Sequence, residues 1–183
     1  LAFVIVTSMV MKAYFPQIKG YIGEKRIHRE LEKLGEEYRI FNDMYVPKQD
    51  GQLTQVDHVV LSKYGVFVIE TKNYLGWIFG SEKQKNWTQT IYKKKTRFYN
   101  PILQNNGHMK ALKVLLNEIP EDVFQSIIVF SERCEKKKVH IDSSDILLCR
   151  RHHLPKRLKK VIQKRKVALT SEEMETIYRK VKA

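Results

Sequence analysis

The sequence has few cysteines and lacks several common ligand-binding signatures. Only two cysteines, Cys134 and Cys149, occur among 183 residues, which excludes the disulfide framework of a small secreted protein and favours a reducing compartment. There is no glycine-rich phosphate loop, no internal repeat and no low-complexity segment. What remains is a chain of single-domain length in which 43% hydrophobic residues suffice to fill a core.

Acidic residues are scarce relative to basic ones. The chain has 20 Asp and Glu against 34 Lys and Arg, a formal charge of +14, and residues 83–97 and 150–166 contain no acid. Such a surface favours polyanions, although a solvated basic face or contact with an anionic membrane would look similar. We expect nucleic acid as the partner, with affinity that falls as salt is added. The candidate contacts are the basic and aromatic side chains of the first stretch: Lys83, Lys85, Trp87, Lys93, Lys94, Lys95 and Arg97.

The N-terminal stretch is apolar but too short to cross a bilayer. Eleven uncharged residues precede Lys12, whereas about 20 are needed for a span. Since the first residue is not methionine, we interpret residues 1–18 as the end of a longer membrane anchor. Lys19 and Lys25, which follow, would keep the rest of the chain on the cytoplasmic face. A signal-peptide remnant and a soluble N-terminal helix are the alternatives.

The segment TQVDHVVLSKYGVFVIETKN, residues 54–73, is typical of a β-hairpin with charged residues at its open end. Residues 56–61 and 66–69 are rich in β-branched and aromatic side chains, and a polar turn ending in glycine joins them. Pairing Leu61 with Val66 brings Asp57 opposite Glu70. Both faces of this hairpin are mostly apolar, which predicts a sheet covered by helices on both sides.

Two facing carboxylates with a lysine beside them indicate a cation site. Asp57 and Glu70 would repel each other across the strands, and Lys72 points to the same face as Glu70 because side chains alternate. A hard divalent cation that prefers oxygen ligands, such as Mg²⁺ or Mn²⁺, would resolve the repulsion. The alternative is a structural ion pair in which Lys72 alone neutralises the acids.

Two helices flank this hairpin in the sequence. A helix is predicted over residues 21–34, with Gly20 and Gly35 at its ends, and its Glu24 has a simple explanation as a first-turn acid that complements the helix dipole. Asn100 as N-cap and a proline after it begin a second helix, which places Gln104 and His108 on one face. The remaining predicted strands cover residues 38–46, 77–80, 87–92, 123–130, 139–141 and 146–149, and a helix is expected over 153–166.

The motifs KGYIGE, TQVDHVV, GVFVIETKN and NPILQN, followed by the strand at 127–130, occur in this order in NERD (nuclease-related) domains. The resemblance covers residues 19–131, and NERD domains are similar to the PD-(D/E)XK nuclease superfamily. It implies a restriction-endonuclease-like α/β sandwich: a central mixed four-stranded sheet flanked by helices, here with an extra β-hairpin and an α/β C-terminal extension. We therefore expect an anchor segment (1–18), a nuclease-like core (19–131) and a basic extension (132–183) packed on that core.

Carried over residue by residue, the resemblance implies a catalytic set at the hairpin's open end. Asp57 and Glu70 match the metal-binding acids of the core strands, and Lys72 matches the lysine that follows them. Glu24 matches a glutamate of the first helix and would reach Mg²⁺ (or Mn²⁺) through water, and Gln104 matches a polar residue of the second helix. The implied activity is metal-dependent hydrolysis of nucleic acid phosphodiester bonds, with DNA favoured over RNA.

Two alternatives of other classes are compatible with the same residues. One is a non-catalytic module that binds nucleic acid and keeps only the nuclease-like fold. The other is a scaffold at the cytoplasmic membrane face whose basic C-terminal segment binds anionic lipid.

Overall fold

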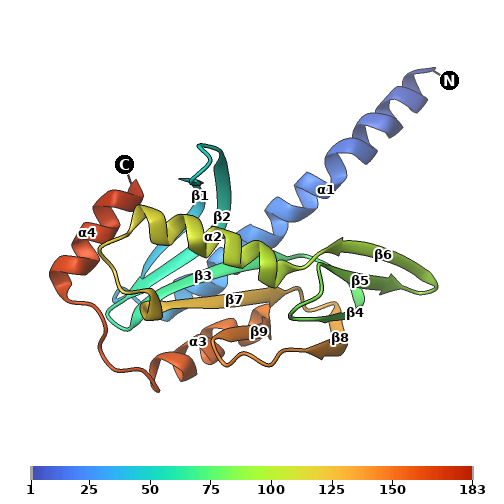
Figure 1. Ribbon diagram of the computed structural model, residues 1–183. Helices are drawn as coiled ribbons and strands as arrows, with labels where there is room; N and C mark the ends of the chain where they lie inside the picture. Colours follow the sequence, from blue (N-terminus) through green and yellow to red (C-terminus); the bar gives the residue numbers. More distant parts are fainter. Residues whose placement is uncertain (1, 183) are drawn as a thin grey trace.

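The computed structural model describes residues 2–182, and within them the side chains of residues 14, 15 and 17–182. A five-stranded mixed sheet with strand order β1-β2-β3-β7-β9 forms its centre (Figure 1). β1, β2 and β3 pair antiparallel, while β7 and β9 continue parallel to β3. The strand bounds are β1 Arg39–Pro47, β2 Leu53–Ser62, β3 Gly65–Lys72, β7 Phe124–Phe130 and β9 Ile146–Arg150.

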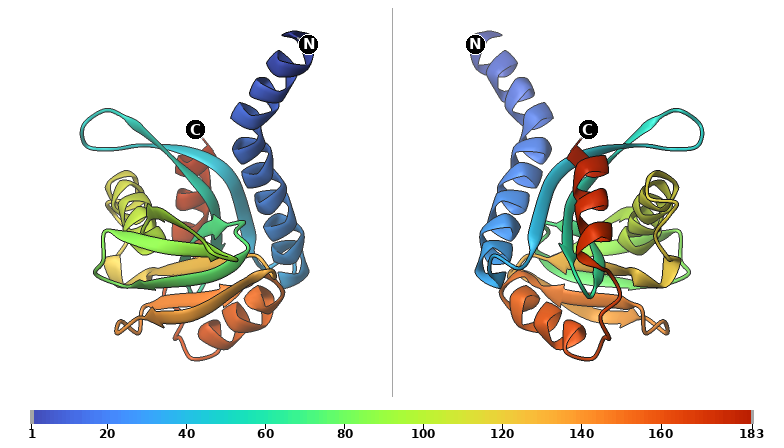
Figure 2. Two further views of the ribbon diagram at one scale, coloured as in Figure 1. Left: turned by 90° about the vertical axis from the view of Figure 1, so that its right-hand side faces the viewer. Right: turned by 90° about the vertical axis from the view of Figure 1, so that its left-hand side faces the viewer.

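Helices cover both faces of this sheet, as Figures 1 and 2 show. Their bounds are α1 Ala2–Leu31, α2 Pro101–Leu115, α3 Leu154–Ile162 and α4 Ser171–Lys182, with short 3₁₀ turns at η1 Glu32–Leu34, η2 Glu121–Val123 and η3 Arg151–His153. One face packs Val59 and Val68 against α2 and α4, and the other packs Val60 and Phe67 against α1 and α3. The predicted mixed sheet flanked by helices is confirmed, and it has one strand more than expected because β9 joins its edge.

The hairpin register follows the predicted alternation up to the charged end. Leu61 pairs with Val66 and Val59 with Val68, and the last pair is His58 with Ile69. The ladder therefore stops one pair short of the predicted pairing of Asp57 with Glu70, which is a correction to the sequence-based register. The reason is local: the backbone N–H of Thr71 donates to Asp57 Oδ2 at 2.7 Å instead of to a strand carbonyl.

A second sheet of four strands lies beside the end of β3, in the order β6-β5-β4-β8. Its strands are β4 Gly76–Ser81, β5 Asn86–Ile91, β6 Lys94–Tyr99 and β8 Cys134–His140. The expected hairpin is present as β4 and β5, while β6 and β8 extend it on either side. Its inner face carries Ile78 and Trp87, which pack on Ile128 and Phe130 of the central layer.

The first helix is longer than predicted. α1 runs without interruption through Gly20, because one glycine in a helix costs only about 1 kcal/mol; its end before Gly35, which has φ 116°, is as predicted. The first half of α1 projects from the body of the protein (Figures 1 and 2). Among the described residues, no helix combines the length and apolarity that a bilayer crossing needs. The expected anchor at 1–18 falls largely on residues 1–13 and 16, whose side chains lie outside the described part of the chain.

Candidate functional site

The site lies where β2 and β3 separate at the end of the central sheet. Beyond the last pair of the ladder, the Asp57 carboxylate accepts the Thr71 N–H and so holds the two strand ends together. On its other edge β3 continues to pair with β7 as far as Lys72. The strand end is therefore fixed on both sides, and the side chains of Asp57, Glu70 and Lys72 all line one pocket.

Glu70 is the most buried acid of the site, with 1% of its surface exposed. Its Oε1 accepts a hydrogen bond from Lys72 Nζ at 2.6 Å, and Lys72 Nζ also donates to Gln104 Oε1 at 3.0 Å. Glu70 Oε2 lies 3.1 Å from Nε2 of His108, whose Nδ1 lies 2.9 Å from Thr54 Oγ1. A buried carboxylate is thus held by two nitrogen groups, which compensates the cost of removing it from water.

The start of α2 is fixed by Asn100, which positions Gln104 and His108. Asn100 Oδ1 accepts the N–H of Ile102 at 2.9 Å, as predicted for an N-cap. Its Nδ2 donates to the carbonyl oxygens of Ser81, Glu82 and Gln84 at 2.7–3.3 Å. Gln104 and His108 stand four residues apart on one helix face, so both reach the end of β3.

α1 approaches the site from the opposite side and brings Glu24. Gly23 lies so close to Asn73 that an added Cβ would stand 2.6 Å from the Asn73 Cβ. Asn73 Nδ2 also donates to the carbonyl oxygen of Lys19 at 2.7 Å. This close contact between the helix and the residue after β3 brings Glu24 into the pocket that Asp57, Glu70 and Lys72 line.

Burial, together with the neighbouring charges, shifts the pKa values of these groups. Burial, followed by the charge of Glu70, raises the pKa of Asp57 to about 8, against the lowering effect of the Thr71 N–H. Burial and then the charges of Asp43 and Glu70 raise the pKa of Glu24, whereas Lys72 lowers it. Burial lowers the pKa of Lys72, but the charge and hydrogen bond of Glu70 outweigh it, so the net pKa is raised.

All five residues predicted for catalysis therefore line one pocket: Glu24, Asp57, Glu70, Lys72 and Gln104. Within the described side chains, no group of three or more His, Cys, Asp or Glu residues is arranged to hold a metal ion. The carboxylates of Asp57 and Glu70 fit a divalent cation by their chemistry, because both supply oxygen ligands, and burial followed by the charge of Glu70 disfavours an uncompensated negative charge on Asp57 and raises its pKa. An ion on Glu70 would compete with Lys72 and His108 for its oxygens.

Sequence reasoning missed His108 and Asp43. The helix pattern places His108 on the face of Gln104, and that spacing was a usable signal, but a lone histidine has a structural explanation more often than a functional one. Asp43 adopts φ 52° at the position between two β1–β2 pairs, Asn42 with His58 and Met44 with Val56. The charge of Asp43 raises the pKa of Glu24. No sequence pattern predicts the irregular backbone at Asp43.

One predicted nucleic-acid contact is wrong. Trp87 has no exposed surface; it stacks on Phe130 with ring centroids 6.3 Å apart and donates its Nε1–H to the carbonyl oxygen of Ser81. It belongs to the core because strand alternation turns position 87 inward together with Ile78. The basic residues predicted with it are exposed: Lys83, Lys85, Lys93, Lys94, Lys95 and Arg97.

A family comparison confirms the resemblance that the motifs carry. Residues 19–131 match the family model described as the nuclease-related domain. An uncharacterized protein of Bacillus anthracis is 37% identical over 179 residues, which span 97% of this chain and 82% of that protein. Among solved structures, the small subunit of the heterodimeric restriction endonuclease R.BspD6I matches with 10% identity and a TM-score of 0.36, covering 95% of this chain and 97% of that subunit.

Proposed function

This chain belongs to the nuclease-related domain (NERD) family, and from that premise we propose that it is a metal-dependent nuclease that hydrolyses phosphodiester bonds, with DNA favoured over RNA. The observation that carries the proposal is the meeting of Asp57, Glu70 and Lys72 in one pocket. A binding surface has no need of two adjacent acids removed from water, where burial and then the charge of Glu70 raise the pKa of Asp57. A hydrolase that uses a divalent cation does need them.

Asp57 and Glu70 would hold Mg²⁺ or Mn²⁺, and Glu24 would contribute through water, since Mg²⁺ usually keeps several waters. The cation, when bound, would polarise the scissile phosphate and lower the pKa of water. Lys72, held at 2.6 Å from Glu70, presents an ammonium group that offsets charge developing on the phosphate. Gln104 fixes the Lys72 amine by accepting its hydrogen bond at 3.0 Å.

The alternative is a non-catalytic module that binds nucleic acid with a nuclease-like fold. One observation favours it: Glu70 is already paired with both Lys72 and His108, so the acid is compensated without any metal. In that case Lys72 would be a structural ion-pair partner. The two functions differ in whether Lys72 is required for hydrolysis or for folding.

The deciding experiment is digestion of plasmid and oligonucleotide substrates with Mg²⁺ or Mn²⁺. We compare the unaltered protein with Asp57→Asn, Lys72→Ala and, as a matched control, Lys110→Ala on the exposed side of α2. The nuclease proposal expects a loss of roughly a hundredfold or more for Lys72→Ala and normal cleavage for Lys110→Ala. Undiminished cleavage in both site variants would refute the site, and no cleavage by the unaltered protein would favour the binding module.

We also propose a location at the cytoplasmic face of a membrane, reached through the N-terminal segment. The supporting observation is a row of exposed apolar side chains on α1, with Tyr14, Phe15, Ile18 and Tyr21 each more than half exposed. Replacing Phe15 and Ile18 with Asn should abolish flotation with phosphatidylserine vesicles if these side chains enter the bilayer. Flotation that survives this change would assign lipid binding to the basic C-terminal segment instead.

A further inference from the structure

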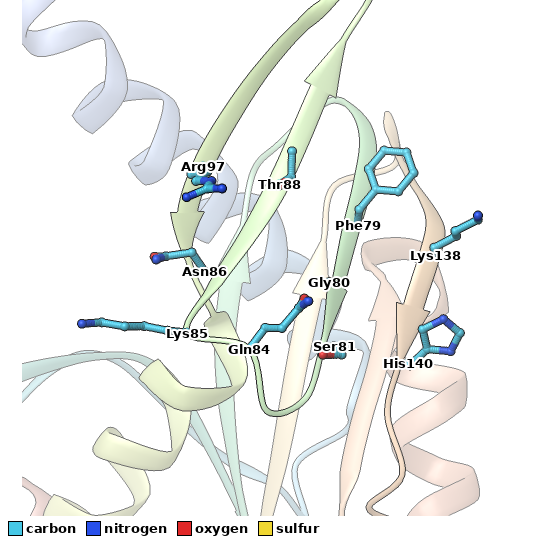
Figure 3. Close-up of a pocket in the computed structure, with 10 residues that line it drawn as sticks. All are labelled: Phe79, Gly80, Ser81, Gln84, Lys85, Asn86, Thr88, Arg97, Lys138 and His140. Atoms are coloured by element: carbon cyan, nitrogen blue, oxygen red, sulfur yellow. The ribbon is translucent and has the colours of Figure 1, made fainter.

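The outer face of the four-stranded sheet is open and carries aromatic rings beside cations. The inner face of this sheet is taken up by contact with the central layer, through Ile78 and Trp87. On the outer face Trp77 is 47% exposed and Phe79 is partly exposed. We refer to this side of β4, β5, β6 and β8 as the open face; two adjoining hollows lie on it, one of them drawn in Figure 3.

One row of residues crosses the open face from edge to edge. Strand register pairs Phe79 with Thr88 on one side and with Lys138 on the other, and Thr88 in turn with Arg97. The row therefore reads Arg97, Thr88, Phe79, Lys138 across the four strands (Figure 3). An aromatic ring with cations on both sides suits a ligand in which a flat ring carries anionic groups. The flat ring can stack on the aromatic side chain, and the anionic groups can pair with the cations.

A second row repeats this arrangement two residues along. Trp77 pairs with Thr90, and Thr90 with Lys95, so an exposed ring again has a cation two strands away. The acid in this row, Glu135, is paired with Lys137 at 2.8 Å, and that lysine also lies 5.2 Å from the Trp77 ring. The negative charge in the row is therefore compensated within the protein.

The spacing of the two rings selects between paired and unpaired nucleic acid. Trp77 and Phe79 are two residues apart on β4, which places them about 7 Å apart along the strand. Consecutive bases in a duplex strand are only about 3.4 Å apart. Two neighbouring bases can stack on these rings only when the strand is stretched and its bases are unpaired.

We propose that the open face binds a single-stranded segment of nucleic acid, with unpaired bases on Trp77 and Phe79 and phosphates near Lys95, Arg97 and Lys138. The inference rests on the proposed function for the class of partner, and adds that the substrate presents an unpaired strand. The face follows the site directly in the chain, because only residues 73–75 separate β3 from β4. Tyr74 of this connection lines the pocket and packs on Phe98 of β6 with ring centroids 4.8 Å apart.

The test measures binding of a labelled oligothymidylate, alone and as a duplex with oligodeoxyadenylate, by fluorescence anisotropy in EDTA. Trp77→Ala and Phe79→Ala should each weaken single-strand binding about five- to a hundredfold, the range for losing one base–aromatic contact. Duplex binding should change less than twofold. The matched control is Tyr45→Ala, which removes an exposed aromatic side chain on β1 and should bind both forms normally. If Trp77→Ala and Phe79→Ala both keep the single-strand affinity of the unaltered protein, the inference is overturned.

Intrinsic fluorescence localises the contact independently. Of the two tryptophans, Trp77 is exposed and Trp87 is buried, so quenching by the oligonucleotide should report Trp77 alone. Trp77→Phe should lose the quenching while keeping affinity within about threefold, since the ring still stacks. Quenching that persists in Trp77→Phe would place the strand elsewhere. Binding to phosphatidylserine vesicles that Trp77→Ala and Phe79→Ala weaken, in a protein whose Phe15 and Ile18 are replaced with Asn, would assign the face to membrane lipid.

The two proposals fail separately. If oligothymidylate quenches the tryptophan fluorescence of the unaltered protein but no substrate is cleaved, the nuclease proposal is wrong and the open-face proposal stands. If the unaltered protein cleaves, and Trp77→Ala and Phe79→Ala bind and cleave single strands normally, the open-face proposal is wrong and the nuclease proposal stands.

Discussion

The raised pKa of Asp57 makes a definite prediction about stability against pH. The carboxyl group has an ordinary pKa of 3.8 and a folded-state pKa of about 8. Between these values the folded protein binds more protons than the unfolded chain, so the free energy of unfolding decreases as pH rises. The favourable contribution is complete below the unfolded pKa and is lost once pH passes the folded one.

The size of this effect follows from the difference between the two values. At 1.36 kcal/mol for each unit of pKa, the difference between 3.8 and about 8 sets a ceiling of about 6 kcal/mol. Because the Asp57 side chain keeps some contact with the pocket, we expect about 2–3 kcal/mol across the range from about pH 4 to pH 8. Urea unfolding followed by circular dichroism at several pH values measures it directly.

Asp57→Asn removes the titrating group and keeps the shape of the side chain. This variant should lose most of the pH dependence and exceed the unaltered protein in stability at high pH. The matched control is Asp50→Asn in the exposed turn after β1, which should leave the slope as it was. Mg²⁺ should stabilise the unaltered protein more at high pH than at low pH, since it binds the ionised carboxylate. Equal slopes in Asp57→Asn and the unaltered protein would refute the electrostatic account of this site.

Three other predictions test the structure at separate points. Trp87→Ala should destabilise the fold by about 3–5 kcal/mol, as for truncating a buried aromatic, yet leave the affinity for DNA and the slope of its salt dependence unchanged at a temperature where the variant is folded; an affinity reduced about fivefold or more, as for a lost base–aromatic contact, would restore Trp87 as a contact. Arg97→Gln should lower that slope for single strands by about 0.7 for one lost phosphate contact, measured by anisotropy titrations at several salt concentrations. Gly23→Ala should force α1 away from Asn73 and lower cleavage without moving the open face, so single-strand binding serves as its internal control.

The hairpin could be predicted from the sequence because the alternation of side chains along a strand depends only on neighbouring residues. Side chains alternate across a strand, so one correct pair, Leu61 with Val66, fixes every other pair up to His58 with Ile69. The same rule failed at the open end, where the Asp57 side chain replaces a ladder bond. Hydrophobic alternation says nothing about which polar group will take a backbone N–H once pairing stops.

The features that the sequence did not predict have a different cause: they depend on tertiary contacts. An aromatic residue in a basic segment was read as a nucleic-acid contact, but whether Trp87 faces in or out depends on the core that β4 and β5 cover. The extent of α1 beyond Gly20 and the pairing of His108 with Glu70 also depend on neighbours far away in the chain. The motifs picked out five residues that do line one pocket, because four of these five lie in or beside local patterns, the hairpin end and the capped helix, that short-range rules describe.

The side-chain amide of Asn100 gives the loop between β4 and β5 a fixed length. Its nitrogen donates to three carbonyl oxygens of that loop, those of Ser81, Glu82 and Gln84, while its own oxygen accepts the first N–H of α2. Inserting residues at 82–85 would pull those carbonyls out of reach and let the first turn of α2 unwind, and Gln104 lies in that turn. Natural variation in length should therefore be tolerated at the β5–β6 tip and excluded here, although both loops lie on the surface.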